Sequence, residues 1–572
     1  MIAEAQADVP ADVTGAPALT LDDAQLGELE LLLSGAFAPL RGFMGAADVA
    51  AVVERGTLAD GTPWPVPVTL DVSPDAVPAD ARRVALTDPE GTPLAVLDIA
   101  ERSEVRASRP ARDRTEVRRT RLSGPVTGLR EPEHGPFRRL MLHPAQARAE
   151  LGDGPVLAYA TRGPVHSRQI GQLRHMAGQL KARVLLLPLI AGPADVVTRP
   201  EALIRAVLAA AASLPPATMV IPVPLAARGP DSGAGPAGEL EVRALVAGAY
   251  GATHLMADDG PPEVGVPLAA TAPAITLATT TLTVSPPAAT PSAASPGGPS
   301  AASQAGPGAG GPGPAVPRGP VIPIVRPGDW AYDPRAEVWR PLALIEAGTE
   351  QGDLSPGELG DVLDAGAEVP AWFTPPAVAR ELRRARPPRA ERGFVLFLTG
   401  LSGSGKSTIA RNLRDVLAER GDRKVSLLDG DLVRQLLSAG LAFSRADRDL
   451  NILRIGFVAA EIARHGGIAI CAPIAPYAAT RARVREMVSE VGDFLLIHVA
   501  TPLEVCEARD RKGLYAKARA GLIDQFTGIS DPYEEPADAD LVLDTSTMTR
   551  EQAADAVLGL LTAGGWLSAQ RG

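Results

Sequence analysis

The chain has 572 residues, a formal net charge of -11 and an apolar fraction of 45%. It holds two cysteines, Cys471 and Cys506, which excludes a disulfide-stapled secreted scaffold and a zinc site built from several cysteines. The acidic balance argues against nucleic acid or an anionic membrane as a general partner. No apolar run approaches the ~18 residues that span a bilayer. The N-terminal residues lack the pattern of a secretory signal, so we expect a cytoplasmic protein of several domains.

The first half of the chain contains two stretches of different character. Residues 1–140 carry short apolar segments separated by turns, such as WPVPVTLDV (64–72) and TPLAVLDIA (92–100), which predict a mostly β domain. Residues 155–256 alternate apolar strands with helical stretches, which predicts a parallel α/β sheet. Residues 285–317 contain neither a charged nor an aromatic side chain, so we expect a flexible linker or a disordered loop.

The second half begins after a polar, proline-containing segment. RARPPRAERG (384–393) favours an interdomain hinge that few contacts cross. Beyond it, apolar strands again alternate with helical stretches, which predicts a second parallel sheet. The predicted strands of this sheet are residues 394–399, 424–429, 467–474, 494–501 and 541–545.

The most specific motif of the chain is GLSGSGKST (400–408), which follows the pattern G-x-x-x-x-G-K-[ST]. It lies between a predicted strand and a predicted helix, as a phosphate-binding P-loop requires. Glycines let such a loop fold around phosphate oxygens, and the helix N-terminus adds partial positive charge. Lys406 would reach the β- and γ-phosphates, and Ser407 would bind Mg²⁺. The predicted ATP-binding residues are Gly400, Gly403, Ser404, Gly405, Lys406, Ser407 and Thr408.

An acidic pair follows the next predicted strand of the same domain. Asp429 and Asp431 flank Gly430, and Arg434 comes about one turn into the following helix. Carboxylates at the carboxyl end of a strand, opposite a P-loop, can hold Mg²⁺ or accept a hydroxyl proton. We therefore expect a phosphotransferase in which Asp429 and Asp431 are candidates for metal binding and for general-base catalysis.

Four motifs in order give the domain a resemblance to a known family. Residues 427–459, beginning LLDGDLVR, resemble the pattern DGDxxR…GFSxxDRxxNxRRxG of the adenylylsulfate (APS) kinases. KGLYAKARAGLIDQFTGISDPYEEP (512–536) is similar to the family's lid, KGLYKKARxGxIxxFTGxxxPYExP, and APYAATR (475–481) resembles its S-P-Y/F segment. With the P-loop, the resemblance covers about residues 394–565.

This resemblance implies a reaction, a substrate site and roles for the acidic pair, with Asp431 as general base and Asp429 as a metal ligand. ATP and APS would give ADP and 3′-phosphoadenylyl sulfate (PAPS), with Mg²⁺ bound to ATP. Arginine, lysine and asparagine would grip the phosphosulfate and ribose, and two phenylalanines would sandwich the adenine. The family also suggests a homodimer through this domain. The implied APS-binding residues are Arg434, Phe443, Arg448, Asn451, Lys512 and Phe526.

Three positions depart from the family pattern. Leu450 and Leu453 replace a glutamate and an arginine of DRxENIRR, which would weaken APS binding, although Arg454 remains. Ala475 stands where many members have a serine that is sometimes described as a phosphorylated intermediate. Direct in-line transfer does not need this serine, so we expect activity without it.

The front half resembles a second family, ATP sulfurylase (sulfate adenylyltransferase). The resemblance rests on LELLLSGAFAPLRGFMG (29–45), YGATHLM (250–256) and residues 353–384, and covers about 20–384. It implies a PUA-like β domain and a Rossmann-like, nucleotidyltransferase-type α/β domain before the P-loop kinase. The predicted domains are residues 1–140, 141–284, 321–387 as the remainder of the sulfurylase-like region, and 388–572, with 285–320 as a low-complexity insertion.

The catalytic motifs of that second family have changed. The family motif is Q-T-R-N-P-x-H-x-x-H, and residues 158–169 keep its Thr161, Arg162, Pro164 and His166. Arg162 and His166 could still bind an anion, so we expect a degenerate site. Two acids, Asp258 and Asp259, replace the basic G-R-D-H-A-G motif and would repel ATP. Ala160, Gly163 and Gln169 stand in place of the family's glutamine, asparagine and second histidine.

Three functions follow as hypotheses. The first is an APS kinase of sulfate assimilation or of sulfation-donor supply, with ATP and APS as partners and a separate sulfurylase as a further candidate partner. The second is a bifunctional enzyme in which an active sulfurylase feeds the kinase. The third is a regulatory or scaffold protein that only senses PAPS, against which the intact Lys406 argues.

Overall fold

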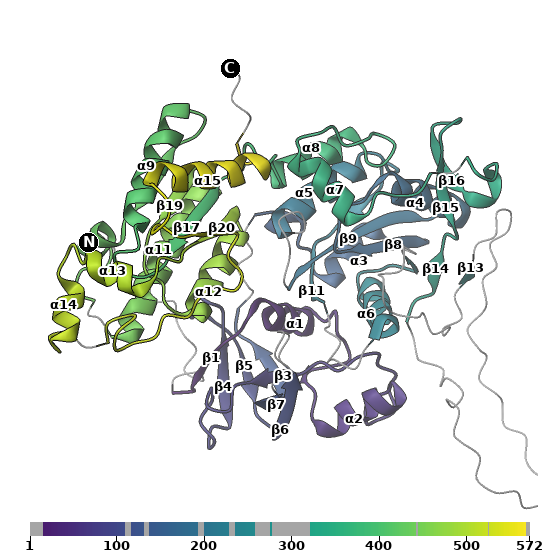
Figure 1. Ribbon diagram of the computed structural model, residues 1–572. Coiled ribbons are helices and arrows are strands. Elements are labelled where there is room, and N and C mark those ends of the chain that lie inside the picture. Colours follow the sequence, from purple (N-terminus) through teal and green to yellow (C-terminus); the bar gives the residue numbers. More distant parts are fainter. Residues whose placement is uncertain are drawn as a thin grey trace, which may run out of the picture. The chain divides into compact units, whose positions relative to one another are not determined.

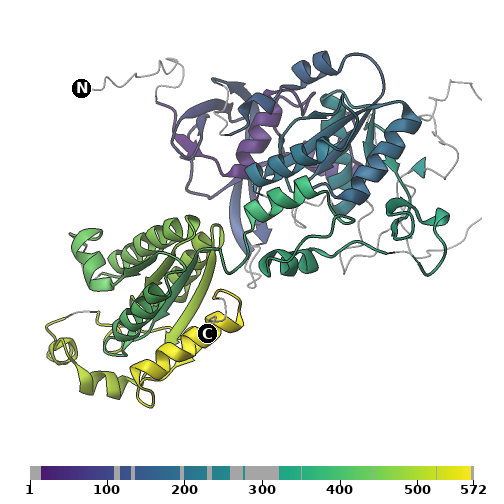
Figure 2. The same ribbon diagram turned by 90° about the horizontal axis from the view of Figure 1, so that it is seen from above.

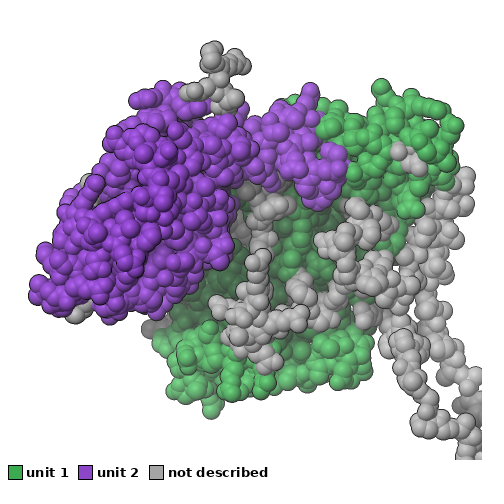
Figure 3. Space-filling view, in the orientation of Figure 1, with its two compact units in different colours: residues 1–353, 370–381 green, residues 354–369, 382–572 purple. Residues whose placement is uncertain are grey.

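The structure is a computed structural model, and it describes residues 15–108, 116–130, 136–192, 199–227, 235–257, 275–276, 321–349, 351–441, 444–523 and 525–567. The chain divides into two compact units. The first comprises residues 1–353 with 370–381, and the second comprises residues 354–369 with 382–572 (Figure 3). Within the described ranges, each helix is too short or too polar to cross a membrane.

The first unit opens with the predicted β domain. Its central strands β4 and β5 pair antiparallel and bury Leu86 and Leu97 completely. Two helices that the sequence did not predict, α1 (Asp23–Leu33) and α2 (Ala46–Arg55), also belong to it. The strands are β1 (Ala18–Thr20), β2 (Gly42–Phe43), β3 (Leu70–Val72), β4 (Arg83–Thr87), β5 (Pro93–Asp98), β6 (Glu101–Ser108) and β7 (Glu116–Gly128).

Helix α1 lies directly against strand β11 (Val223–Ala226) of the following α/β domain. A Cβ atom on Gly27 of this helix would stand 2.2 Å from the carbonyl oxygen of Pro224. Only glycine permits so close a backbone approach. The β domain and the α/β domain therefore share one hydrophobic core, which includes Leu29 and Leu225.

The α/β domain contains the predicted parallel sheet, in the order β10-β9-β8-β12-β14-β13 with β11 also on β9. Strand β12 pairs with β8 on one side and with β14 on the other, through Leu255 opposite Ala158 and Ile324. The predicted insertion 285–320 lies outside the described residues, and the strand after it returns to the sheet. The remaining bounds are β8 (Val156–Thr161), β9 (Arg183–Ala191), β10 (Met219–Val220), β12 (His254–Met256), β13 (Ile275–Thr276), β14 (Ile324–Arg326), α3 (Pro144–Leu151), α4 (Ser167–Leu180), α5 (Pro200–Ala211), α6 (Gly235–Ala249), β15 (Trp330–Asp333) and β16 (Val338–Pro341).

The second unit contains a parallel sheet in the order β18-β19-β17-β20-β21, and each predicted strand is present. Alternate residues of the buried central strand β17 serve two cores. Leu396 packs in the core of helices α9 and α15, whereas Val395 and Phe397 pack in the core of α11 and α12 (Figures 1 and 2). The bounds are β17 (Phe394–Thr399), β18 (Val425–Leu428), β19 (Ile468–Cys471), β20 (Asp493–Val499), β21 (Leu541–Leu543), α7 (Pro356–Asp364), α9 (Lys406–Arg420), α10 (Gly430–Leu436), α11 (Arg445–Arg464), α12 (Ala478–Ser489), α13 (Leu503–Arg509), α14 (Leu514–Arg519) and α15 (Arg550–Ala563). Helix α8 (Pro376–Ala385) begins in the first unit and ends in the second.

The segment predicted to be a hinge is anchored rather than free. Asp364, whose side chain is 9% exposed, binds Arg386 through two hydrogen bonds of 2.7 and 2.8 Å. Arg389 and Arg392 contact the same carboxylate, and Arg392 also binds Asp493 at 2.9 Å. Three arginines of 384–393 thus converge on one acid, whereas Arg384 and Glu391 face solvent.

We expect Asp364→Asn to lower the free energy of unfolding of the second unit by up to about 3 kcal/mol, because it removes the negative charge that Arg386, Arg389 and Arg392 share. Burial raises the pKa of Asp364, but hydrogen bonds and charges from Arg386 and Arg392 outweigh it, so this pKa lies below 3.8. The stabilisation is therefore present above that pH and is lost as pH falls through the folded pKa. Denaturant unfolding at several pH values measures this. The exposed Asp361→Asn on the same helix is the control, and a deficit independent of pH would contradict the assignment.

Candidate functional site

The P-loop connects the central strand β17 to helix α9, and its backbone requires glycine. Gly400, Gly403 and Gly405 have φ values of 148°, 79° and 102°, in the region that side chains avoid. A Cβ atom on Gly400 would stand 2.4 Å from the carbonyl oxygen of Val499. The loop is thus held tightly against strand β20, with the N-terminus of α9 following it.

Lys406 is buried at the start of α9, with its ammonium inside the loop. Its Nζ donates to the carbonyl oxygens of Gly400 at 2.9 Å and Leu401 at 2.6 Å. Burial lowers the pKa of Lys406 to about 8. A desolvated cation that meets mainly neutral oxygens would gain from an anionic ligand, so this position suits a phosphate.

Other residues that fix the loop were not predicted from the sequence. The carbonyl oxygen of Ser404 accepts hydrogen bonds from the hydroxyls of Thr501 at 3.1 Å and Thr545 at 2.8 Å. Tyr515 of helix α14 donates to the carbonyl oxygen of Ser402 at 2.8 Å. Both threonines come soon after a parallel strand ends, where ligand sites of such sheets form, and this signal could have found them.

The predicted acids lie at the end of strand β18. Asp429 follows the strand directly, approaches Arg411 at 3.4 Å, and its charge acts on Lys406. The side chain of Asp431 is outside the described part, and Arg434 is half-buried on α10. Among the described residues, no three His, Cys, Asp or Glu side chains form a metal cluster. Mg²⁺ often takes one or two protein ligands and completes its shell with phosphates and water, so Ser407 and Asp429 are suitable donors.

Helix α11 contributes two buried polar side chains of the predicted substrate site. Arg448 is 9% exposed and Asn451 is 5% exposed, and residues three apart share a helix face. The Nε atom of Arg448 and the Oδ1 atom of Asn451 have no hydrogen-bond partner among the described residues. Since each such atom costs about 1–3 kcal/mol when left unpaired, the pair indicates a place for a polar ligand. Phe443 lies outside the described residues.

The lid segment borders a cavity beside the P-loop. Lys512 is exposed, whereas Phe526 is buried and meets the ring of Tyr515 edge to face, with centroids 5.0 Å apart. Stacking of Phe526 on an adenine stays a prediction. The cavity has a volume of about 540 Å³ and is lined by Leu401, Gly528, Ile529, Ser530, Asp531, Pro532, Tyr533 and Glu535.

The departures from the family pattern have different surroundings. Leu450 is 41% exposed, while Leu453 is half-buried against the core of α11. Arg454 donates to the carbonyl oxygen of Leu437 at 2.8 Å, which ties it to the end of the α10 segment. Ala475 is buried with a φ of 46°, so its backbone occupies the left-handed region.

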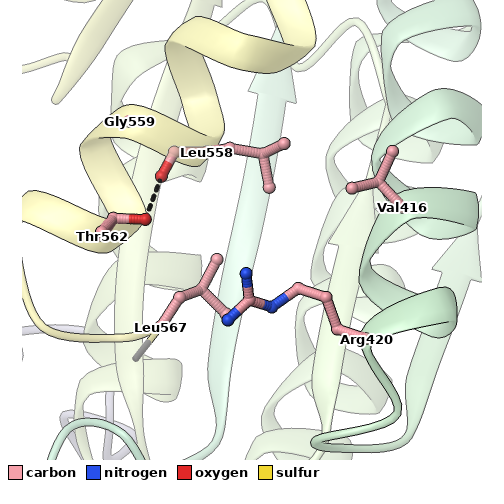
Figure 4. Close-up of a pocket in the computed structure, with 6 residues that line it drawn as sticks. All are labelled: Val416, Arg420, Leu558, Gly559, Thr562 and Leu567. Atoms are coloured by element: carbon pink, nitrogen blue, oxygen red, sulfur yellow. Dashed lines mark hydrogen bonds between the residues drawn. The ribbon is translucent and has the colours of Figure 1, made fainter. Parts of the chain in front are cut away.

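A second cavity of about 250 Å³ lies between helices α9 and α15 (Figure 4). Its lining residues Val416 and Arg420 follow Lys406 by 10 and 14 residues. At ~1.5 Å per residue, they lie roughly 15–21 Å along the helix from that lysine. This cavity therefore does not belong to the P-loop site.

In the first unit, Arg162 follows strand β8 and makes internal contacts. Its Nη1 donates to the carbonyl oxygen of Leu225 at 2.9 Å, and its Nη2 binds Glu239 at 3.1 Å. Glu239 also pairs with Arg243 at 3.0 Å. A carboxylate of the protein itself therefore offsets the positive charge at this end of the sheet.

His166 precedes helix α4 and is likewise engaged by protein groups. Its ring stacks on Phe373 with centroids 4.3 Å apart, and its Nδ1 lies 3.0 Å from the hydroxyl of Thr374. Its backbone amide donates to the side chain of Gln169 at 3.2 Å. Asp258 and Asp259 fall outside the described residues.

Comparisons with known proteins divide the chain in the same order. Residues 392–544 match the adenylylsulphate kinase family, and residues 2–120 match the PUA-like domain family. Sulfate adenylyltransferase of Mycosarcoma maydis is 34% identical over 96% of this chain and 94% of its own length. That of Phaeosphaeria nodorum is 35% identical over the same shares. A solved structure, the hexameric APS kinase from Thiobacillus denitrificans, is 32% identical with a TM-score of 0.69, covering 98% of this chain and 95% of that one.

Proposed function

Because the chain belongs to the sulfate adenylyltransferase family and carries an adenylylsulphate kinase domain, we propose that it converts ATP and APS to ADP and PAPS. The observation that carries this proposal is the pair of unpartnered atoms on the buried Arg448 and Asn451. Arg448 contacts Asp531, which lines the 540 Å³ cavity together with Leu401 of the P-loop. A nucleotide in this cavity would therefore lie between the phosphate loop and the buried arginine.

In the proposed mechanism, the protein positions two anions and removes one proton. Lys406 and the loop amides hold the ATP phosphates in line with the 3′-oxygen of APS. Ser407 and Asp429 would hold Mg²⁺, which supplies neutralisation of the charge on the transferring group. Asp431 accepts the proton of the 3′-hydroxyl. The residues proposed to bind APS are Arg434, Phe443, Arg448, Asn451, Lys512 and Phe526.

The decisive measurement is ADP release by the purified full chain with Mg-ATP, with and without APS. We expect release that depends on APS and yields PAPS. Inorganic sulfate without APS is the matched control and should give no release. ADP release that ignores APS, or PAPS binding without any turnover, would refute the kinase and favour the sensor hypothesis.

A second candidate function has a specific observation in its favour. The full-length relatives of the two fungi are named sulfate adenylyltransferase, which favours a bifunctional enzyme. The solved neighbour of nearly the same extent is named APS kinase, which favours the kinase alone. We infer that the front half has lost sulfurylase activity, since family donors are replaced by Ala160, Gly163 and Gln169 and since Arg162 is already paired with Glu239. The hexameric state of that neighbour also supports a homo-oligomer here, of which the predicted dimer would be one unit.

A further inference from the structure

The lid segment (512–536) contacts Arg448 through the carboxylate of Asp531, a residue that the family's lid motif does not specify. Nη1 of Arg448 lies 2.8 Å from Oδ2 of Asp531 and donates to the hydroxyl of Thr527 at 3.1 Å. Nη2 of the same arginine donates to the hydroxyl of Tyr477 at 2.9 Å, and that hydroxyl donates to Asp531 at 2.6 Å. In the lid pattern FTGxxxPYExP, residue 531 stands at an open position.

This network is mostly buried and contains one ion pair. The side chains of Arg448 and Asp531 are 10% and 17% exposed, so their attraction is screened less than that of a surface pair. Burial and the hydrogen bond to Asp531 raise the pKa of Tyr477 to about 12, which keeps its hydroxyl protonated as a donor at neutral pH. Arg445 also lies over the Tyr477 ring, 4.2 Å from its centroid. The lid, helix α11 and the segment before α12 therefore meet at one carboxylate.

The hydrogen bonds of Arg448 show which of its donors is left without a partner. Both Nη atoms are engaged by the lid and Tyr477, while Nε has no described partner. An arginine held at two points loses little rotamer freedom when it binds a ligand through the third. The negative charge of Asp531 would repel the phosphosulfate group, so we expect its contribution at the cavity wall to be the orientation of the cation.

We propose that Asp531 is a positioning residue of the APS site, which fixes the guanidinium of Arg448 for its contact with the anionic substrate. This inference rests on the proposed kinase function. It predicts that Asp531 affects the use of APS and leaves the use of ATP unchanged, because the P-loop contacts of Lys406 do not involve it.

The test is steady-state kinetics of Asp531→Ala in the full chain, with APS and ATP varied separately. We expect the KM for APS to rise about tenfold, as for the loss of a charge-assisted hydrogen bond, with kcat changed less than about threefold. The KM for ATP should stay within about twofold. Asp531→Asn keeps an acceptor oxygen for Tyr477 and Arg448, so its KM for APS should fall between those of Asp531→Ala and the wild type.

A matched control is Asp538→Ala, which removes a carboxylate paired with Arg485 at 3.2 Å in the same unit. It should leave both KM values unchanged. An unchanged KM for APS in Asp531→Ala would overturn the inference. A lower KM would show that the carboxylate competes with the substrate, and equal increases for both substrates with a lowered Tm would show a role in folding. A wild type without APS-dependent turnover would refute the proposed function itself.

Discussion

Replacing Lys406 with alanine is expected to reduce APS-dependent phosphoryl transfer at least a hundredfold. The ammonium is the buried cation of the P-loop, and removing one donor to a developing charge typically costs about 10²–10³ in rate. The hydrogen bonds that the substitution removes go to carbonyl oxygens of its own loop. Burial lowers the pKa of Lys406 to about 8, which shows that the buried ammonium is unfavourable in the enzyme without ATP. The alanine variant no longer carries this buried charge. The folded state should therefore remain intact.

The measurement compares turnover, Tm and ATP binding of Lys406→Ala with those of Lys424→Ala. Lys424 is exposed just before strand β18 in the same unit, so its variant controls for loss of a lysine. We expect wild-type turnover in the control and an unchanged Tm in both. Near-normal turnover by a well-folded Lys406→Ala protein would remove the P-loop from the mechanism.

The kinase sheet could be predicted because its signals are local. Strands such as 394–399 are short apolar runs between turn and helix signals, and a P-loop joins a strand to a helix. The order of the strands could not be read in this way, since pairing of β17 with β19 and β20 joins residues far apart in sequence.

Helix α1 of the first unit was not predicted, for a related reason. Its apolar residues suit either a strand or a helix, and its packing on β11 decides between them.

The same distinction between local signals and long-range contacts applies to the candidate site. Residues of the P-loop and of α11 match motif positions, whereas Asp531 stands at an open position of the lid motif and becomes a partner of Arg448 only in the fold. Tyr477 stands in the segment 475–481, but its hydrogen bond to Arg448 could not be read from the motif. The polar segment 384–393 shows the opposite error. Its arginines predicted a solvated hinge, but Asp364, about 20 residues earlier, collects them in the fold. A charge run identifies polar side chains and does not identify their partners.

For the sulfurylase-like front half, we expect the full chain to show no measurable sulfate-dependent ATP–pyrophosphate exchange. Adenylyl transfer needs cationic or donor groups around the α-phosphate, and each lost donor costs about 2.7–4 kcal/mol. The chain lacks several such groups, as Ala160, Gly163 and Gln169 show. The structure adds that Arg162, the remaining cation of the motif, is already bound to Glu239 and to the carbonyl oxygen of Leu225.

Variants of Arg162, His166 and Glu239 test whether the sulfurylase-like site is inactive because donors are missing or because Arg162 is held in an ion pair. Arg162→Ala and His166→Ala should leave APS kinase turnover unchanged, because both residues contact groups of the first unit, whereas the P-loop lies in the second. Glu239→Gln removes the carboxylate that pairs with Arg162, so it tests whether this ion pair suppresses ATP–pyrophosphate exchange. If exchange stays absent in this variant, the missing donors limit the reaction rather than the ion pair. Robust exchange by the wild type that vanishes in His166→Ala would instead make the protein bifunctional, since a single side chain of the old motif would then control adenylyl transfer.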